Sequence, residues 1–264
     1  MNAINRSEVE PFSVQPFSYQ DPAGLEPTEV LDIIFSRRFG VEYQPIVQVQ
    51  SAEIIGYQAS ARFWTQDQRL VNAGRMFDCL HRNPLLLFHT EFELKKLQIS
   101  RSPAAGWLML DLDIDSFLEG GDSLQNPFLE LFKAFAWSEQ EIIINVVENA
   151  NKADALQSQR MIELLQQSGI AVALEDIGVR WGMFSLSAFM DARVIKFNGL
   201  ALKALNEEAA NATLEWLVSA ANKIGVQTIL DGVVTLAQLE WAKKMGVDCV
   251  QGSLFTAQSI QVKS

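Results

Sequence analysis

The amino-acid sequence predicts an α/β fold, a modified TIM-type (β/α)8 barrel with one antiparallel strand. Three observations lead to this class: six short apolar runs that each end on a polar residue, helical segments between these runs, and two adjacent strand-like runs joined by only three residues. Buried parallel strands that alternate with helices are typical of α/β proteins. An open doubly wound sheet is the architectural alternative, and it too would place its site at the strand ends.

The N-terminal segment is predicted to be an irregular tail followed by a helix. Residues 1–27 are polar and contain four prolines. Thr28 is placed to cap a helix that ends at Gly40, because threonine is a common N-cap and glycine often follows the last helical turn. We therefore assign residues 1–27 to the tail and residues 28–264 to a single barrel domain.

The next segments predict a hairpin and an interrupted helix. Runs 41–49 and 53–63 are strand-like, and their short connection makes them antiparallel neighbours. Residues 71–98 have helical periodicity that is broken at Pro84, since proline lacks the backbone N–H that a helix interior needs. These predictions place a helix and one antiparallel strand ahead of the parallel repeat.

Six apolar runs end on polar residues that lie 20 to 35 positions apart. These polar residues are Asp111, Asn145, Glu175, Lys196, Asp231 and Gln251. Helical segments over 153–169, 205–225 and 235–246 fill three of the intervals, which are long enough for a helix and a return. In a parallel barrel the carboxyl ends of the strands converge on one rim, where sites are built. The paired acids Glu175 and Asp176 are therefore predicted to face this rim.

The candidate site at the rim combines carboxylates with a lysine. The acids are Asp111, Glu175, Asp176 and Asp231, and the lysine is Lys196. Such a set suits oxygen-preferring divalent cations such as Mg²⁺. The structural alternative is that each acid caps the following helix or shapes a turn. Six consecutive run ends of this kind favour a shared site over six separate caps.

Composition narrows the class of function. The 264 residues carry a formal net charge of −11, which disfavours the phosphate contacts that dominate nucleic-acid binding. Cys79 and Cys249 match no zinc or disulfide spacing, which favours a reducing compartment. The sequence has no secretory signal and no apolar run near the roughly 18 residues of a membrane span. We expect a cytoplasmic protein that contacts neither nucleic acid nor membrane directly.

Other catalytic and metal-binding motifs find little support in the sequence. No GxSxG, HExxH, P-loop or GxGxxG spacing is present. The two histidines, His81 and His89, are interpreted as ordinary helix residues. The acidic alternation DLDID at 111–115 is similar to the start of a calcium loop, but it lacks the glycine and the distal glutamate that such a loop requires. We therefore assign no calcium ion to it.

Several short strings, in order along the chain, resemble the EAL domain family. They are YQPIV at 43–47, YQASARF at 57–63, EDIGVRW at 175–181, LDGVVTLAQLE at 230–240 and QGSLF at 251–255. From Glu175 to Lys196 the spacing equals the family pattern without a gap, and the resemblance covers roughly residues 28–258. The resemblance implies a modified TIM barrel of the kind that bacterial cyclic di-GMP phosphodiesterases use.

Two amides stand where the resemblance implies carboxylates. The metal-binding glutamate of the Glu-Ala-Leu signature is Gln58 here. The glutamate of the Glu-x-Thr motif is Asn145, with Val147 in place of the threonine, and the family's metal-binding asparagine is Asp111. Because a neutral amide supplies no anionic oxygen, Gln58 and Asn145 should weaken any Mg²⁺ site.

Side-chain length also departs from the family pattern. The paired aspartates of the family are Glu175 and Asp176 here, so the first is one methylene longer. The glutamates of the Glu-Gly-Val-Glu motif are Asp231 and Val234. Mg²⁺ demands near-ideal octahedral geometry with oxygens at about 2.0–2.1 Å. We therefore expect no metal cofactor, and Mg²⁺ or Mn²⁺ only if the site is active.

Part of the family's nucleotide site is retained. The candidates for nucleotide contact are Gln44, Arg62, Asp176 and Gln251. Arginine can hold a phosphate through two parallel hydrogen bonds; the alternative is that Arg62 only pairs with a rim acid such as Asp111 or Asp231. The nucleotide pocket lacks two features of the family pattern. Val234 stands in place of a glutamate, and the family's proline after the Gln-Gly motif is absent. We therefore expect any binding of cyclic di-GMP to be weak.

The resemblance and its departures together predict a catalytically silent EAL-type regulator of bacterial cyclic di-GMP-related signalling. Its relic catalytic positions are Gln58, Asp111, Asn145, Glu175, Asp176, Lys196, Asp231 and Gln251. We expect it to act through a protein partner, for instance a basic regulator, since an acidic surface steers association towards basic surfaces. The alternative is an active metal-dependent cyclic di-GMP phosphodiesterase.

Overall fold

A computed structural model of the protein provides the geometry of most of the chain. It describes residues 25–103, 106–135, 140–147, 152–177, 186–203, 205 and 207–264. The side chains of 147, 152–155, 176, 177 and 203 are outside this description. The predicted irregular tail falls almost entirely on residues 1–24, which lie outside the described residues.

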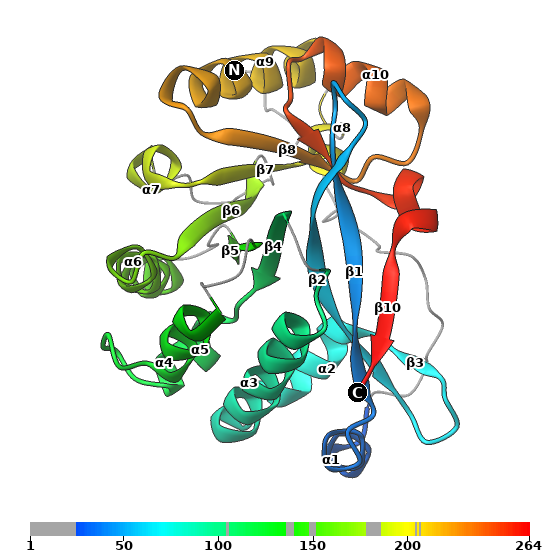
Figure 1. Ribbon diagram of the computed structural model, residues 1–264, viewed down its shortest axis with the longest axis vertical. Coiled ribbons are helices and arrows are strands. Elements are labelled where there is room, and N and C mark those ends of the chain that lie inside the picture. The colour runs from blue at the N-terminus through cyan, green and yellow to red at the C-terminus, as the bar shows by residue number, and fades with distance from the viewer. Residues whose placement is uncertain are drawn as a thin grey trace, which may run out of the picture.

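Eight strands close into a barrel, which confirms the predicted fold class (Figure 1). The strands are β1 (Phe39–Gln48), β2 (Ile54–Trp64), β4 (Gly106–Asp111), β5 (Gln140–Val147), β6 (Ala171–Ile177), β7 (Val194–Asn198), β8 (Gln227–Asp231) and β9 (Cys249–Val250). Strand β1 is antiparallel to both of its barrel neighbours, β2 and β9, whereas the other neighbouring pairs are parallel. The open doubly wound alternative is therefore wrong.

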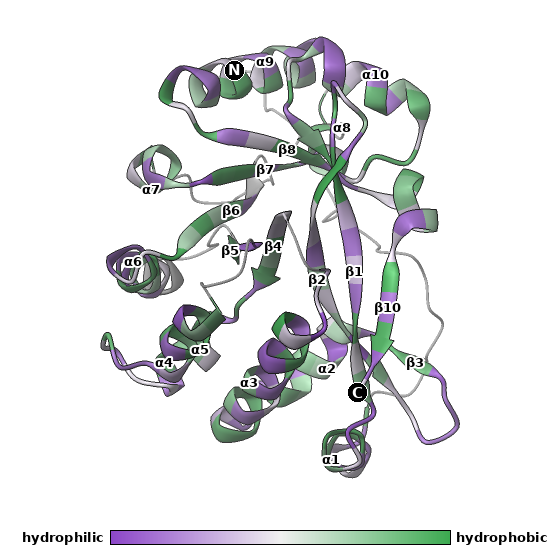
Figure 2. Cartoon of the chain, viewed as in Figure 1, coloured by the Kyte–Doolittle hydropathy of each residue, from purple (hydrophilic) through white to green (hydrophobic). Residues whose placement is uncertain are grey.

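Helices follow most of the strands and lie on the outside of the barrel. They are α1 (Pro27–Phe35), α2 (Ala73–Leu80), α3 (Pro84–Ser100), α4 (Ile114–Glu119), α5 (Pro127–Phe135), α6 (Lys152–Gln167), α7 (Leu186–Asp191), α8 (Gly199–Lys203), α9 (Glu207–Ile224) and α10 (Leu236–Lys244). Apolar and polar residues alternate along these helices in Figure 2. This alternation lets each helix bury one face against the strands and leave the other to solvent.

Two short strands extend the sheet outside the barrel. Strand β10 (Ile260–Lys263) pairs with the start of β1, beyond the region that β9 covers, and β3 (Leu70–Val71) pairs with the end of β2. A 3₁₀ helix, η1 (Ser253–Gln258), connects β9 to β10. Within the described ranges, no helix combines the length and the apolar character needed to cross a membrane.

The predicted helix near the N-terminus differs from the observed one at both ends. Helix α1 starts at Pro27, so Thr28 lies inside the helix and does not cap it. Arg37 has a left-handed backbone with φ of 52°, and the chain then turns into β1, which contains Gly40. A Cβ atom on Gly40 would lie 2.3 Å from the carbonyl oxygen of Val262 on β10. This glycine is therefore required by close strand packing and not by a helix end.

Other predicted boundaries agree with the structure. Pro84 is the first residue of α3, and the Asn83 side chain caps that helix by accepting a hydrogen bond from the backbone N–H of Leu86. Proline suits this position because its missing N–H would have no helical partner there. Gly225 and Gly246, which follow α9 and α10, have φ of 78° and 76°, as expected of glycines after a helix end.

Candidate functional site

The barrel interior has an apolar level with a polar level above it at the rim. The apolar level includes Ile46, Met109, Ile143, Ala173, Val194, Ile229 and Cys249. A set of polar residues lies two positions nearer the rim than this apolar level. These residues are Gln44, Gln58, Asp111, Asn145, Glu175, Lys196, Asp231 and Gln251. Side chains alternate between the two faces of a strand, so residues two positions apart share the inward face. This period explains why apolar runs end on residues that meet inside the rim.

Five of these side chains form a closed ring of hydrogen bonds, which we call the rim network. Its members are Gln58, Asp111, Asn145, Glu175 and Lys196. The Gln58 amide donates to Asp111 Oδ1 at 2.7 Å, and the Asn145 amide donates to the same oxygen at 2.7 Å. The Asn145 amide also donates to Glu175 Oε2. The Lys196 ammonium closes the ring, at 2.5 Å from Glu175 Oε1 and 2.8 Å from Gln58 Oε1.

Both amides of the rim network have their orientation set by its charges. The Asn145 nitrogen bridges two carboxylates, and only the N–H side of an amide can donate to both. The Gln58 oxygen faces the Lys196 ammonium while its nitrogen faces Asp111. Two neighbouring carboxylates would repel each other, and here amide donors and one ammonium lie between them.

The ion pair between Lys196 and Glu175 is buried. Lys196 is 1% exposed and the Glu175 side chain 17%, and Asp231 Oδ2 lies 3.7 Å from the ammonium. Burial on its own would lower the pKa of Lys196, but Glu175, Asp231 and Asp111 outweigh it and raise that pKa. Burial, reinforced by the charge of Asp111, raises the pKa of Glu175 despite the attraction of Lys196. The ammonium is therefore charged at neutral pH and is the only described cation in the network.

The remaining predicted residues lie at the margin of the rim network. The Gln251 amide donates to Gln44 Oε1 at 3.4 Å across the β9–β1 side of the barrel. Asp231 Oδ1 accepts a hydrogen bond from the backbone N–H of Gly232 at 2.6 Å, so this oxygen shapes the local turn. Asp176 lies in β6, but its side chain and residues 178–185 are outside the described part of the chain.

Arg62 does not pair with either of the rim acids considered as alternatives. Its guanidinium forms an ion pair with Glu42 on the neighbouring strand β1. Arg62 lies four residues beyond Gln58 on β2, roughly 13 Å along the strand at about 3.3 Å per residue. The alternative of a pair with Asp111 or Asp231 is not observed, because the hairpin register places Glu42 nearer to Arg62. A ligand phosphate would compete with the Glu42 carboxylate for this arginine.

One further cluster was not predicted from the sequence. His81, just after α2, has its Nε2 atom 2.9 Å from Asp113 Oδ2 and 3.7 Å from Asp115 Oδ2. The interpretation of His81 as an ordinary helix residue was incomplete, because the pairing depends on how α2 and α4 pack. Its only sequence signal was the acidic alternation at 111–115, which contains both aspartates.

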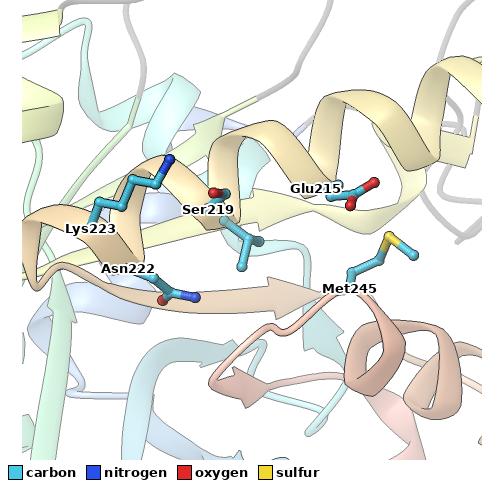
Figure 3. Close-up of a pocket in the computed structure, with 6 residues that line it drawn as sticks. Glu215, Ser219, Asn222, Lys223 and Met245 are labelled. Atoms are coloured by element: carbon cyan, nitrogen blue, oxygen red, sulfur yellow. The ribbon is translucent and has the colours of Figure 1, made fainter.

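The outer surface carries an open hollow between α9 and the end of α10 (Figure 3). The hollow has a volume of about 360 Å³ and is lined by Glu215, Val218, Ser219, Asn222, Lys223 and Met245. Trp216, on the same helix as most of these residues, is 63% exposed. The lining comes from the helices outside the barrel and includes none of the predicted rim residues.

The whole barrel corresponds to one known family. The model of the EAL domain matches residues 29–258, and the chain belongs to the EAL domain family. The probable cyclic di-GMP phosphodiesterase PdeB of Escherichia coli K12 is 22% identical over 231 residues, which cover 85% of this chain and 43% of that protein. MucR of Pseudomonas aeruginosa, a bifunctional diguanylate cyclase and cyclic di-GMP phosphodiesterase, is 22% identical over 227 residues, covering 83% and 33%. The chain thus spans less than half the length of these relatives.

Solved structures of EAL proteins share the fold. The MucR phosphodiesterase in complex with cyclic di-GMP superposes with a TM-score of 0.68 at 19% identity, covering 86% of this chain and 94% of that one. The Bacillus subtilis YkuI protein, in complex with cyclic di-GMP and calcium, gives a TM-score of 0.74 at 19% identity, covering 91% and 59%. The FimX EAL domain of Pseudomonas aeruginosa, bound to cyclic di-GMP, gives 0.64 at 16% identity, covering 85% and 92%.

Proposed function

We propose that this chain is a non-catalytic EAL-domain regulator that acts by binding, with a protein as its principal partner. The observation that carries the proposal is the rim network, in which amides and a lysine hydrogen-bond to the carboxylates at the place where the family resemblance implies a metal. Gln58 and Asn145 present N–H donors, and a donor hydrogen repels a cation that approaches the same carboxylate oxygen. Lys196, which the family pattern retains, supplies a positive charge beside Glu175.

The donor set fits a divalent cation poorly as it is arranged. Mg²⁺ needs about six oxygens at about 2.0–2.1 Å. Asp111 Oδ1 and both oxygens of Glu175 already accept hydrogen bonds from the amides and the lysine. A cation would enter only after these bonds were broken and the ammonium displaced.

Hydrolysis is the direct test of the non-catalytic proposal. The purified chain is incubated with cyclic di-GMP and either Mg²⁺ or Mn²⁺, and linear dinucleotide is followed by chromatography, with MucR as the positive control. We expect no turnover, and Gln58→Glu should not restore it because Asn145, Glu175 and Asp231 still depart from the family's ligand set. Turnover near 1 s⁻¹, within the ordinary enzyme range of roughly 1–10³ s⁻¹, would establish the phosphodiesterase instead.

Cyclic di-GMP is the second ligand in this proposal, and we expect it to bind weakly. Gln44 and Gln251 already contact each other, and Arg62 is paired with Glu42. A nucleotide phosphate therefore has to replace an existing ion pair, which reduces the net gain. Calorimetric titration with and without Mg²⁺ measures the affinity. A submicromolar Kd that Arg62→Ala leaves unchanged would contradict this assignment of the contact.

A protein partner is the principal ligand in this proposal. The formal net charge of −11 favours association with a basic surface. Trp216 is exposed on α9, the helix that supplies most of the lining of the hollow in Figure 3, and it has the chemistry of an interface anchor, since tryptophan is enriched among residues that dominate binding energy. A partner held mainly by charge should dissociate as salt is raised, and one anchored by Trp216 should resist salt.

The partner test is an affinity capture from the native cytoplasm at about 0.15 M salt. Trp216→Ser is compared with Phe35→Ser, a matched control because Phe35 on α1 is also an exposed aromatic residue, at 76%. We expect a specific protein that is lost with Trp216→Ser and kept with Phe35→Ser. If no specific protein is captured while cyclic di-GMP binds tightly, a nucleotide receptor replaces the protein-binding regulator.

A further inference from the structure

His81, Asp113 and Asp115 converge at the junction between the end of α2 and the start of α4. Their nearest ligand atoms, one imidazole nitrogen and two carboxylate oxygens, all lie within 4.8 Å of one another. His81 Nε2 is 2.9 Å from Asp113 Oδ2 and 3.7 Å from Asp115 Oδ2. A single ion at about 2.0–2.2 Å from each atom could bridge such a triangle after small side-chain adjustments.

The orientation of the imidazole is set from outside the cluster. His81 Nδ1 lies 2.7 Å from the carbonyl oxygen of Phe77, one helical turn earlier. A carbonyl oxygen only accepts, so Nδ1 must carry the hydrogen, and in the neutral ring Nε2 then presents its lone pair. That lone pair faces two carboxylates, an arrangement that is repulsive unless Nε2 is protonated or a cation lies between them.

The Asp113 carboxylate is also held in place independently of His81. Its Oδ1 atom caps α4 by accepting the backbone N–H of Ser116 at 3.1 Å, which leaves Oδ2 for the cluster. The backbone N–H of Asp113 donates to Glu91 Oε1 at 3.0 Å, and Glu91 is buried on α3. Metal ligands in proteins are commonly oriented by such outer hydrogen bonds to backbone groups.

We propose that His81, Asp113 and Asp115 bind a divalent first-row transition metal ion of the Zn²⁺ type. One imidazole nitrogen with two carboxylate oxygens favours these ions over Mg²⁺ and Ca²⁺, which prefer oxygen ligands only. The exposed fractions of the three side chains, 36%, 24% and 60%, give the ion an open path and leave coordination positions for water or for an acidic group of a partner. The bound ion joins α2 to α4.

This site is separate in its residues from the rim network and does not depend on the proposed function. None of its three ligands belongs to the ring of Gln58, Asp111, Asn145, Glu175 and Lys196. A failure of the metal proposal would therefore leave the non-catalytic proposal intact, and the reverse also holds.

The probe is Co²⁺, whose visible absorption reports coordination, titrated into the whole chain near neutral pH and then displaced with Zn²⁺. We expect one equivalent to bind, and His81→Gln and Asp115→Asn each to weaken binding by at least about 10-fold. His89→Gln is the matched control, because it changes the other histidine of the chain, which is exposed on α3, and it should bind as the wild type does. A large excess of Mg²⁺ should not displace the Co²⁺.

A second measurement keeps the test valid if a variant misfolds. In the wild-type chain, Zn²⁺ should shift the ring Nε2 resonance of one histidine in the ¹⁵N NMR spectrum and leave the other in place. Absence of Co²⁺ and Zn²⁺ binding at millimolar metal would show that a proton alone bridges the cluster, and the proposal would fail. Binding that persists unchanged in His81→Gln would place the metal elsewhere and would equally overturn it.

Discussion

Replacing Lys196 by methionine removes the only described cation of the rim network. Methionine has nearly the same length and no charge, so the change isolates the ammonium from the packing of its stem. In the variant, Glu175 loses its contact at 2.5 Å and Gln58 loses a donor at 2.8 Å. Asp111 and Glu175 then share the buried site with amide donors alone.

The expected loss of stability follows from the burial of the Lys196 side chain. Lys196 is 1% exposed, and removal of one partner from a buried ion pair typically costs about 3–5 kcal/mol because it leaves an uncompensated charge. A domain has about 5–15 kcal/mol of stability in total, so the loss is large. Lys96→Met is the matched control, since Lys96 is 49% exposed and pairs with Glu93. Such surface pairs contribute only about 0.2–1 kcal/mol.

The pH dependence of the free energy of unfolding provides an independent check on the role of Lys196. The pKa of Lys196 is raised, so its stabilisation is complete below the ordinary lysine value of about 10.4 and is lost only as the pH rises through the higher folded-state value. Without Lys196, the pKa of Glu175, which burial already raises, should rise further. The folded variant then binds a proton at a higher pH than the unfolded chain does, so its deficit against the wild type should narrow when stability is measured at a lower pH.

Urea denaturation followed by tryptophan fluorescence measures both effects. We expect Lys196→Met to lower the free energy of unfolding by about 3–5 kcal/mol near pH 7.5, and by less at the lower pH. Addition of Mn²⁺ to the variant is informative as well, because the missing charge could then be supplied by a metal. A loss below about 1 kcal/mol, equal to that of Lys96→Met, would refute the argument that the ammonium holds the rim together.

Three further changes test other parts of the structure, each by urea denaturation. Asn145→Leu should cost about 1–3 kcal/mol, because two half-buried carboxylates lose their shared donor; an unchanged midpoint would contradict the network. Lys95→Met should cost about 3–5 kcal/mol by leaving Glu91 buried without its partner at 3.0 Å, and a companion Glu91→Leu should recover much of it. Gly56→Ala should cost about 1–3 kcal/mol, since the new Cβ would lie 2.5 Å from the Trp107 Cβ; full stability would show that the strands can separate there.

The class of fold could be predicted because it depends on local, periodic features. Apolar runs separated by helix-length intervals gave the parallel strands, and the three-residue connection gave the antiparallel hairpin. The polar residues that end the runs meet at the rim, as predicted, because side chains two positions apart on a strand share a face. The same period explains why Asp111, Asn145, Glu175 and Lys196 could be named in advance from their places in the chain, whereas Gln58 was named only through the resemblance to the EAL signature.

The tertiary structure alone decided which of these side chains contact one another. The rim network follows the order of strands around the barrel, and Lys196 reaches Gln58, 138 positions away, because both face the interior of a closed sheet. Arg62 pairs with Glu42 through the hairpin register. His81 meets Asp113 because α2 and α4 end and begin at one junction. Sequence periodicity determines the face on which a side chain lies, whereas its partner depends on closure and packing that join distant parts of the chain.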